Sequence, residues 1–149
     1  MIRYTESEKV EYYNLVRFRN WIRQDEMSEL YAELNRVILG NNAKKCGPLI
    51  SCTHVVRKNG ETLELDFEIM VPIDKKIPLT MEFCMCEKFT IENAMDVQII
   101  TDKYMLEKEV KEVNGYIKSN NILPKTEIYS VLESEDNEMI NTHLIFGLH

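Results

Sequence analysis

The chain has 149 residues, of which 44% are hydrophobic and 29% are charged, and its formal net charge is −7. This length predicts one domain that buries a core of its own. An acidic chain repels phosphate backbones, and its lysines and arginines are scattered, so we expect no nucleic-acid partner. No apolar run approaches the ~20 residues of a membrane span, and the first residues do not resemble a secretion signal. The sequence therefore predicts a cytoplasmic protein that does not enter a membrane.

The first half of the chain predicts a strand, a helix and a hairpin. Residues 9–22 are rich in aromatic and β-branched side chains, which favours a strand. Apolar residues then recur at helical spacing over residues 27–38. An Asn-Gly pair at residues 59–60 is a strong turn signal, so we expect residues 49–57 and 63–71 to pair as a hairpin.

The second half predicts the same order of elements. Residues 88–101 favour a strand, and residues 102–121 carry a helical stripe of apolar side chains. Residues 124–134 and 139–147 then favour two strands around a polar turn. The repeated order indicates a tandem duplication by element order, without sequence identity between the halves.

Two strand–helix–hairpin modules predict an α+β fold, written (βαββ)×2. We expect a mainly antiparallel sheet, with helices on one face and a concave cleft on the other. The prediction is a single domain, residues 1–149, built of two pseudo-symmetric halves at approximately 8–75 and 86–149. A hollow between two such halves is a usual place for a small ligand.

A carboxylate stands inside the strand predicted at residues 124–134, where Glu127 precedes Ile128 and Tyr129. Such a side chain either points to water or has a specific partner. From the residues alone, a solvated glutamate is the commoner outcome. A similar choice applies to Glu68, which ends a row of acidic residues spaced two apart on its strand. That spacing fits both a wet sheet face and an acidic cleft.

Aromatic residues gather in the strand predicted at residues 9–22. Tyr13 and Trp21 share one side of an ideal strand, so they are candidates to face the cleft. Aromatic side chains in such a position more often belong to the core.

Four segments together resemble the GyrI-like effector-binding superfamily, which includes the ligand domains of AraC- and MerR-type multidrug-response activators. They are "CGPLIS", "LDFEIMVPID", "FTIENAMDVQIIT" and "TEIYSVLES", and they fall in order over nearly the whole chain. The resemblance implies that amphipathic, often cationic molecules bind in the cleft. It implies that Glu127 forms the acidic floor of the pocket, with Tyr129 beside it. Glu68, Tyr13 and Trp21 are the further candidates for lining residues.

The last strand departs from the family pattern. The family carries an acidic residue and a final proline there, whereas "NTHLIFGLH" has His143 and Gly147. The sequence also carries no DNA-binding domain, so we expect a stand-alone form and do not carry over the role of a transcription activator.

Familiar catalytic and metal-binding patterns are missing from the sequence. It has no Gly-rich phosphate loop, G-x-S-x-G or H-E-x-x-H. The spacing of Cys46, Cys52, Cys84 and Cys86 fits no standard zinc site, so we expect reduced thiols. We accordingly name no catalytic residue, no metal and no cofactor.

Three hypotheses follow for the function. The first is a stand-alone protein that binds or senses a small amphipathic, cationic molecule. The second is a protein-binding accessory module (an adaptor, an inhibitor or a chaperone) that uses the same cleft or a sheet edge. The third, which ranks lowest, is a cleft hydrolase that relies on Glu127.

Overall fold

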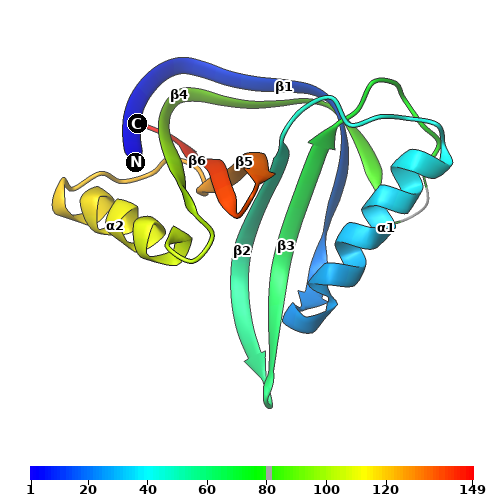
Figure 1. Cartoon of the computed structure of the whole chain (residues 1–149), viewed down its shortest axis with the longest axis horizontal. Helices are drawn as coiled ribbons and strands as arrows, with labels where there is room; N and C mark the ends of the chain where they lie inside the picture. The colour runs from blue at the N-terminus through cyan, green and yellow to red at the C-terminus, as the bar shows by residue number, and fades with distance from the viewer. Residues whose placement is uncertain (80–81) are drawn as a thin grey trace. The chain divides into compact units, whose positions relative to one another are not determined.

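The structure is a computed structural model that describes residues 1–79 and 82–149. Its elements, drawn in Figure 1, are β1 (Ile2–Arg23), the short 3-10 helix η1 (Gln24–Glu26), α1 (Met27–Gly40), β2 (Leu49–Asn59), β3 (Thr62–Pro72), β4 (Cys84–Asp102), α2 (Leu106–Ser119), β5 (Tyr129–Asp136) and β6 (Met139–Gly147). Strand, helix and hairpin thus follow one another twice along the chain.

The predicted fold class is wrong. Strands hold 56% of the residues and helices 21%, and the strand order β1-β3-β2-β5-β6-β4 is that of a closed antiparallel barrel. An open α+β sheet with helices on one face and a free concave face is therefore not the architecture.

The error arises from strand lengths that local sequence does not reveal. β1 and β4 run for 22 and 19 residues, well beyond the predicted segments. The polar start of the chain carries little strand signal, but pairing supplies the missing stabilisation. The amine of Met1 donates to the carbonyl oxygen of Ile100 at 2.8 Å, and the Ile100 N–H donates to the Met1 carbonyl oxygen at 2.9 Å.

The chain divides into two compact units, and each is described by itself. The central unit is Tyr12–Phe89, and the terminal unit joins Met1–Glu11 to Thr90–His149. The single domain with halves at approximately 8–75 and 86–149 stays a prediction.

In the central unit, α1 covers one face of the antiparallel strands β1, β3 and β2 (Figure 1). Leu30, Leu34 and Ile38 recur every four residues, so they share one face of the helix and are buried there. They pack against the face of the sheet that carries Phe18 and Phe67. Full burial of one such side chain stabilises the fold by about 1.5–3 kcal/mol.

In the terminal unit, α2 packs on β4 and β6, which pair antiparallel. The predicted apolar stripe is confirmed, because Val113 and Ile117 are buried against Val97 and Phe146. The carboxylate of Asp102 accepts hydrogen bonds from the backbone N–H groups of the two residues before α2, at 2.9 and 3.0 Å. These bonds satisfy donors that a helix start leaves open.

Among the described residues, no helix combines the length and the apolar character needed to cross a membrane.

Candidate functional site

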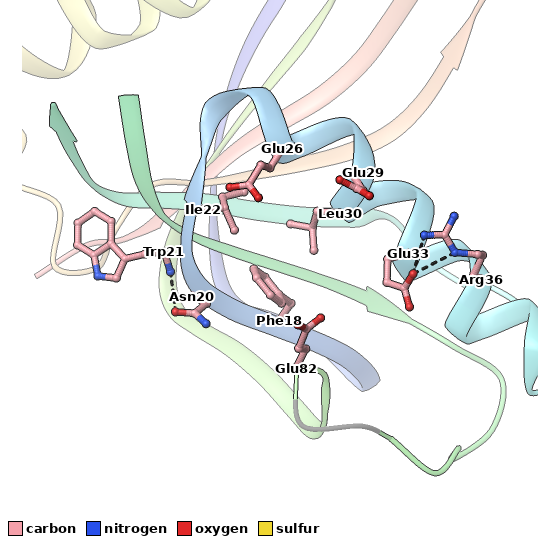
Figure 2. Close-up of a pocket in the computed structure, with 10 residues that line it drawn as sticks. All are labelled: Phe18, Asn20, Trp21, Ile22, Glu26, Glu29, Leu30, Glu33, Arg36 and Glu82. Carbon is pink, nitrogen blue, oxygen red and sulfur yellow. Dashed lines mark hydrogen bonds and ion pairs between the residues drawn. The ribbon is translucent and has the colours of Figure 1, made fainter. Parts of the chain in front are cut away.

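A hollow of about 380 Å³ lies in the central unit, between the end of β1 and the first turns of α1 (Figure 2). Its size is within the range of small-molecule sites, roughly 300–1,000 Å³. The residues around it are Phe18, Asn20, Trp21, Ile22, Glu26, Glu29, Leu30, Glu33, Arg36 and Glu82. All of them belong to the central unit. We call this hollow the α1 pocket.

The floor of the α1 pocket is apolar. Phe18 and Leu30 are buried and Ile22 is half-buried, and Figure 2 shows the three side chains pointing toward one another between β1 and α1. The Phe18 ring also packs against the Phe83 ring, with 5.8 Å between centroids. This packing holds an aromatic surface at the base of the pocket.

The rim of the α1 pocket is acidic, with four glutamates and one arginine. Arg36 forms an ion pair with Glu33, because its Nη2 lies 2.6 Å from Oε2 of that carboxylate. Glu26 accepts a hydrogen bond from the backbone N–H of Arg23 at 2.9 Å. Glu29 and Glu82 form no ion pair with any described residue, so their negative charges face the pocket uncompensated.

Trp21 borders the α1 pocket, but its ring does not enter it. Figure 2 shows the indole pointing away from Leu30 and the other apolar side chains of the floor. The guanidinium carbon of Arg57 lies 3.8 Å from the ring centroid, so the indole face already holds a cation. The role of Trp21 as a ligand contact stays a prediction.

The sheet face opposite α1 carries the predicted row of acidic residues, and each member is paired with an arginine. The pairs are Arg57 with Glu64 at 3.0 Å, Arg19 with Asp66 at 3.2 Å, and Arg17 with Glu68 at 2.7 Å. The arginines come from β1 and β2, which flank β3. This row is therefore a ladder of ion pairs, and its charges are already neutralised.

Glu68 is the most buried member of the ladder, with 4% of its surface exposed. The Nε of Arg17 donates to its Oε2 at 2.7 Å, and the Nε2 of His54 lies 2.8 Å from its Oε1. Burial by itself raises the pKa of Glu68, but the hydrogen bonds from Arg17 and His54 outweigh it, so the pKa falls below its usual value. Glu68 does not line the α1 pocket.

The other predicted site residues are not among those that line the α1 pocket. Glu127 is exposed and precedes β5, and Tyr129 is the half-buried first residue of that strand; both belong to the terminal unit. Tyr13 is 59% exposed on β1. The roles of these three residues as ligand contacts stay predictions.

Sequence reasoning missed the glutamates of the rim. Glu26, Glu29 and Glu33 are spaced by three and four residues, and that spacing places their side chains along one face of a helix. The same spacing is present in "EMSELYAEL", beside the apolar stripe that predicted α1. The acidic stripe could have been found, but a charged stripe on a helix is ordinary without a pocket beside it.

A second hollow of about 280 Å³ lies near the end of α1. Ile38, Leu39, Lys44 and Lys45 are among its lining residues. Its two lysines make it unsuited to a cation, so the α1 pocket is the better candidate site.

Comparison with known proteins gives a likeness in fold alone. No family model and no curated protein sequence matches the chain. Among solved structures, the EcmrR–DNA complex matches with a TM-score of 0.68 at 10% identity, over 100% of this chain. A crystal structure described as a transcription regulation protein from Staphylococcus aureus MU50 matches with a TM-score of 0.51 at 11% identity.

The two matches differ in how much of the other chain they cover. This chain spans 57% of the length of the EcmrR chain and 97% of the length of the Staphylococcus aureus chain. At 10% and 11% identity the two matches show a shared fold alone, and the resemblance to the GyrI-like superfamily stays a prediction.

Proposed function

We propose that the protein binds or senses a small molecule that is both apolar and positively charged, and that the α1 pocket is its binding site. The observation that carries this proposal is an apolar, partly aromatic floor under four carboxylates and one guanidinium. Apolar surface supplies most of the binding free energy in such pockets, and a few charged groups fix orientation and select the ligand. The fold likeness to EcmrR supports a sensing role of the GyrI-like type, without showing a ligand.

The charge of the ligand follows from Glu29 and Glu82. A cation between these carboxylates gains Coulomb attraction, and a flat organic cation also gains contact with the aromatic floor. An anion of the same shape meets repulsion from the same groups. The ladder of ion pairs on the other sheet face offers no such excess of charge, because each carboxylate there has its arginine.

The test compares two ions of nearly equal shape and opposite charge, tetraphenylphosphonium and tetraphenylborate. Trp21 is the only tryptophan and borders the pocket, so its fluorescence serves as a local reporter of binding. We expect tetraphenylphosphonium to change this fluorescence and to raise the melting temperature, and tetraphenylborate to do neither. Equal binding of the two ions would remove the electrostatic part of the proposal.

Variants locate the site. An exposed charge pair contributes about 0.5 kcal/mol, so the double variant Glu29→Gln/Glu82→Gln should weaken tetraphenylphosphonium binding roughly fivefold. Glu61→Gln is the matched control, since Glu61 is an exposed glutamate in the turn between β2 and β3. Glu127→Gln tests the anchor that the sequence predicts. If Glu127→Gln abolishes binding and the double variant leaves it unchanged, the α1 pocket is not the site.

A further inference from the structure

A thiol, an imidazole and a carboxylate form a series on the sheet face opposite α1. The Sγ of Cys52 lies 3.9 Å from the Nδ1 of His54, and the Nε2 of His54 lies 2.8 Å from the Oε1 of Glu68. Cys52 and Glu68 are direct partners in the register of β2 and β3, so the sheet fixes both ends of the series. A nucleophile, a base and a group that orients the base stand in this order in enzymes with an activated cysteine.

A β-bulge places the histidine. The register of β2 against β3 shifts between Thr53 and Val55, so His54 is the extra residue on β2. A bulge of this kind re-aims the side chain it carries. Here the ring lies between the thiol and the carboxylate, and its side chain is only 9% exposed.

Hydrogen bonding sets which nitrogen of His54 holds the proton. The Nε of Arg17 lies 2.7 Å from Oε2 of Glu68, and this contact favours the ionised carboxylate. An ionised carboxylate only accepts hydrogen bonds, so Nε2 of His54 must donate. In the neutral ring, Nδ1 then carries a lone pair directed toward the Cys52 thiol, which is the arrangement of a base.

We propose that Cys52 is a nucleophile that adds to small, uncharged α,β-unsaturated carbonyl compounds, with His54 as its base and Glu68 as the positioning residue. In this step the Cys52 proton passes to Nδ1 of His54, and a bond forms between Sγ and the β-carbon of the compound. The C=C π pair shifts to the bond between the α-carbon and the carbonyl carbon, the C=O π pair moves onto the oxygen as an enolate, and the proton on His54 then passes to the α-carbon. The S–H bond is added across the double bond, so no leaving group or further reactant is needed.

The burial of the thiol selects the class of compound. Cys52 is 5% exposed, so only a small molecule reaches it. Arg17 and Glu68 are already paired with each other at 2.7 Å, so a charged compound would have to pay a desolvation cost in competition with this pair. A polarizable sulfur also reacts readily with an electrophilic carbon once it is deprotonated.

The first test uses the other cysteines of the same chain as internal controls. The folded protein is treated with limiting acrylamide, and the extent of modification at each cysteine is followed by peptide mass mapping. We expect Cys52 to be modified faster than Cys46, which is exposed, although exposure alone favours the opposite order. In urea the two rates should become equal. Modification of Cys52 no faster than that of Cys46 in the folded protein overturns the proposal.

The second test removes the base and the positioning residue in turn. A general base contributes on the order of 10² in rate, so His54→Gln should slow the modification of Cys52 at least tenfold and leave Cys46 unchanged. His143→Gln is the matched control, because His143 is also held by a carboxylate, that of Asp96 at 2.6 Å. An unchanged rate at Cys52 in a folded His54→Gln protein contradicts the role of the histidine.

Glu68→Gln tests the positioning role separately. An amide can donate as well as accept, so it no longer requires the proton at Nε2 of His54. We expect a slower reaction at Cys52 together with a change in the ¹⁵N chemical shifts of the His54 ring. A slower reaction without that change would assign Glu68 a packing role and overturn this part of the proposal.

Discussion

Glu68 shows how one residue ties stability to pH in the central unit. Its carboxylate is almost fully buried and is held by Arg17 and His54. Its pKa is lower in the folded protein than in the unfolded chain, where a glutamate titrates near ~4.3. The stabilisation is therefore present above about pH 5 and is lost as the pH falls through the folded pKa.

Replacing the arginine should remove this dependence. Arg17→Met leaves the Glu68 charge buried without its main partner. The free energy of unfolding at pH 7 should fall by about 2–3 kcal/mol, since breaking a fully buried ion pair destabilises a protein by about 3–5 kcal/mol. The variant should also lose less stability than the wild type between pH 5 and pH 3, because protonation now relieves a buried charge. Urea unfolding at several pH values measures both effects.

Arg19→Met is the control for that prediction. Arg19 and Asp66 form a more exposed ion pair, with 41% of the Arg19 side chain accessible to solvent. The free energy of unfolding should therefore fall by less than about 1 kcal/mol in this variant. Equal losses in the two variants would show that burial of the pair does not matter.

At the scale of elements, two glycines play opposite roles. Gly60 forms the turn between β2 and β3 with a φ of 66°, a conformation that costs an L-residue about 1 kcal/mol. Gly115 lies within α2, and a Cβ added there meets nothing within 4 Å. A glycine inside a helix is about 0.5–1 kcal/mol less favourable than alanine.

Alanine substitutions should therefore shift stability in opposite directions. We expect Gly60→Ala to lower the free energy of unfolding by about 1 kcal/mol and Gly115→Ala to raise it by about 0.5–1 kcal/mol. Thermal and urea unfolding of the two single variants measure the difference. A stabilised Gly60→Ala protein would mean that the turn does not keep its left-handed conformation.

At the scale of the whole molecule, the strand pairings join distant parts of the chain. Leu15 pairs with Pro72, and Ala94 pairs with Gly147. Each such pairing requires a long loop to close, and the entropy of closure is lost before the new contacts stabilise the chain. Proteins dominated by distant strand pairs therefore fold in milliseconds to seconds. We expect refolding on this timescale in stopped-flow experiments that follow Trp21 fluorescence. Completion within microseconds would contradict the observed dominance of distant strand pairs.

Local signals in the sequence predicted the individual elements well. The Asn59-Gly60 turn and the apolar stripe of α2 are present as expected, because turn chemistry and helical periodicity act over a few residues. Strand lengths were underestimated, since the polar first residues of β1 gain their conformation from pairing rather than from propensity. The fold class was missed for the same reason: it depends on which strands pair, and that is not a local property.

By itself the sequence determined that the chain is acidic, which elements it forms and in which order, and that Glu64, Asp66 and Glu68 share a sheet face. Those properties follow from composition and from periods of two and 3.6 residues. Only the tertiary structure decided that arginines from β1 and β2 neutralise that face, and that Glu29 and Glu82, which form no ion pair with any described residue, line a pocket beside α1. The physical reason is that electrostatic pairing depends on distances between strands, which no single segment encodes.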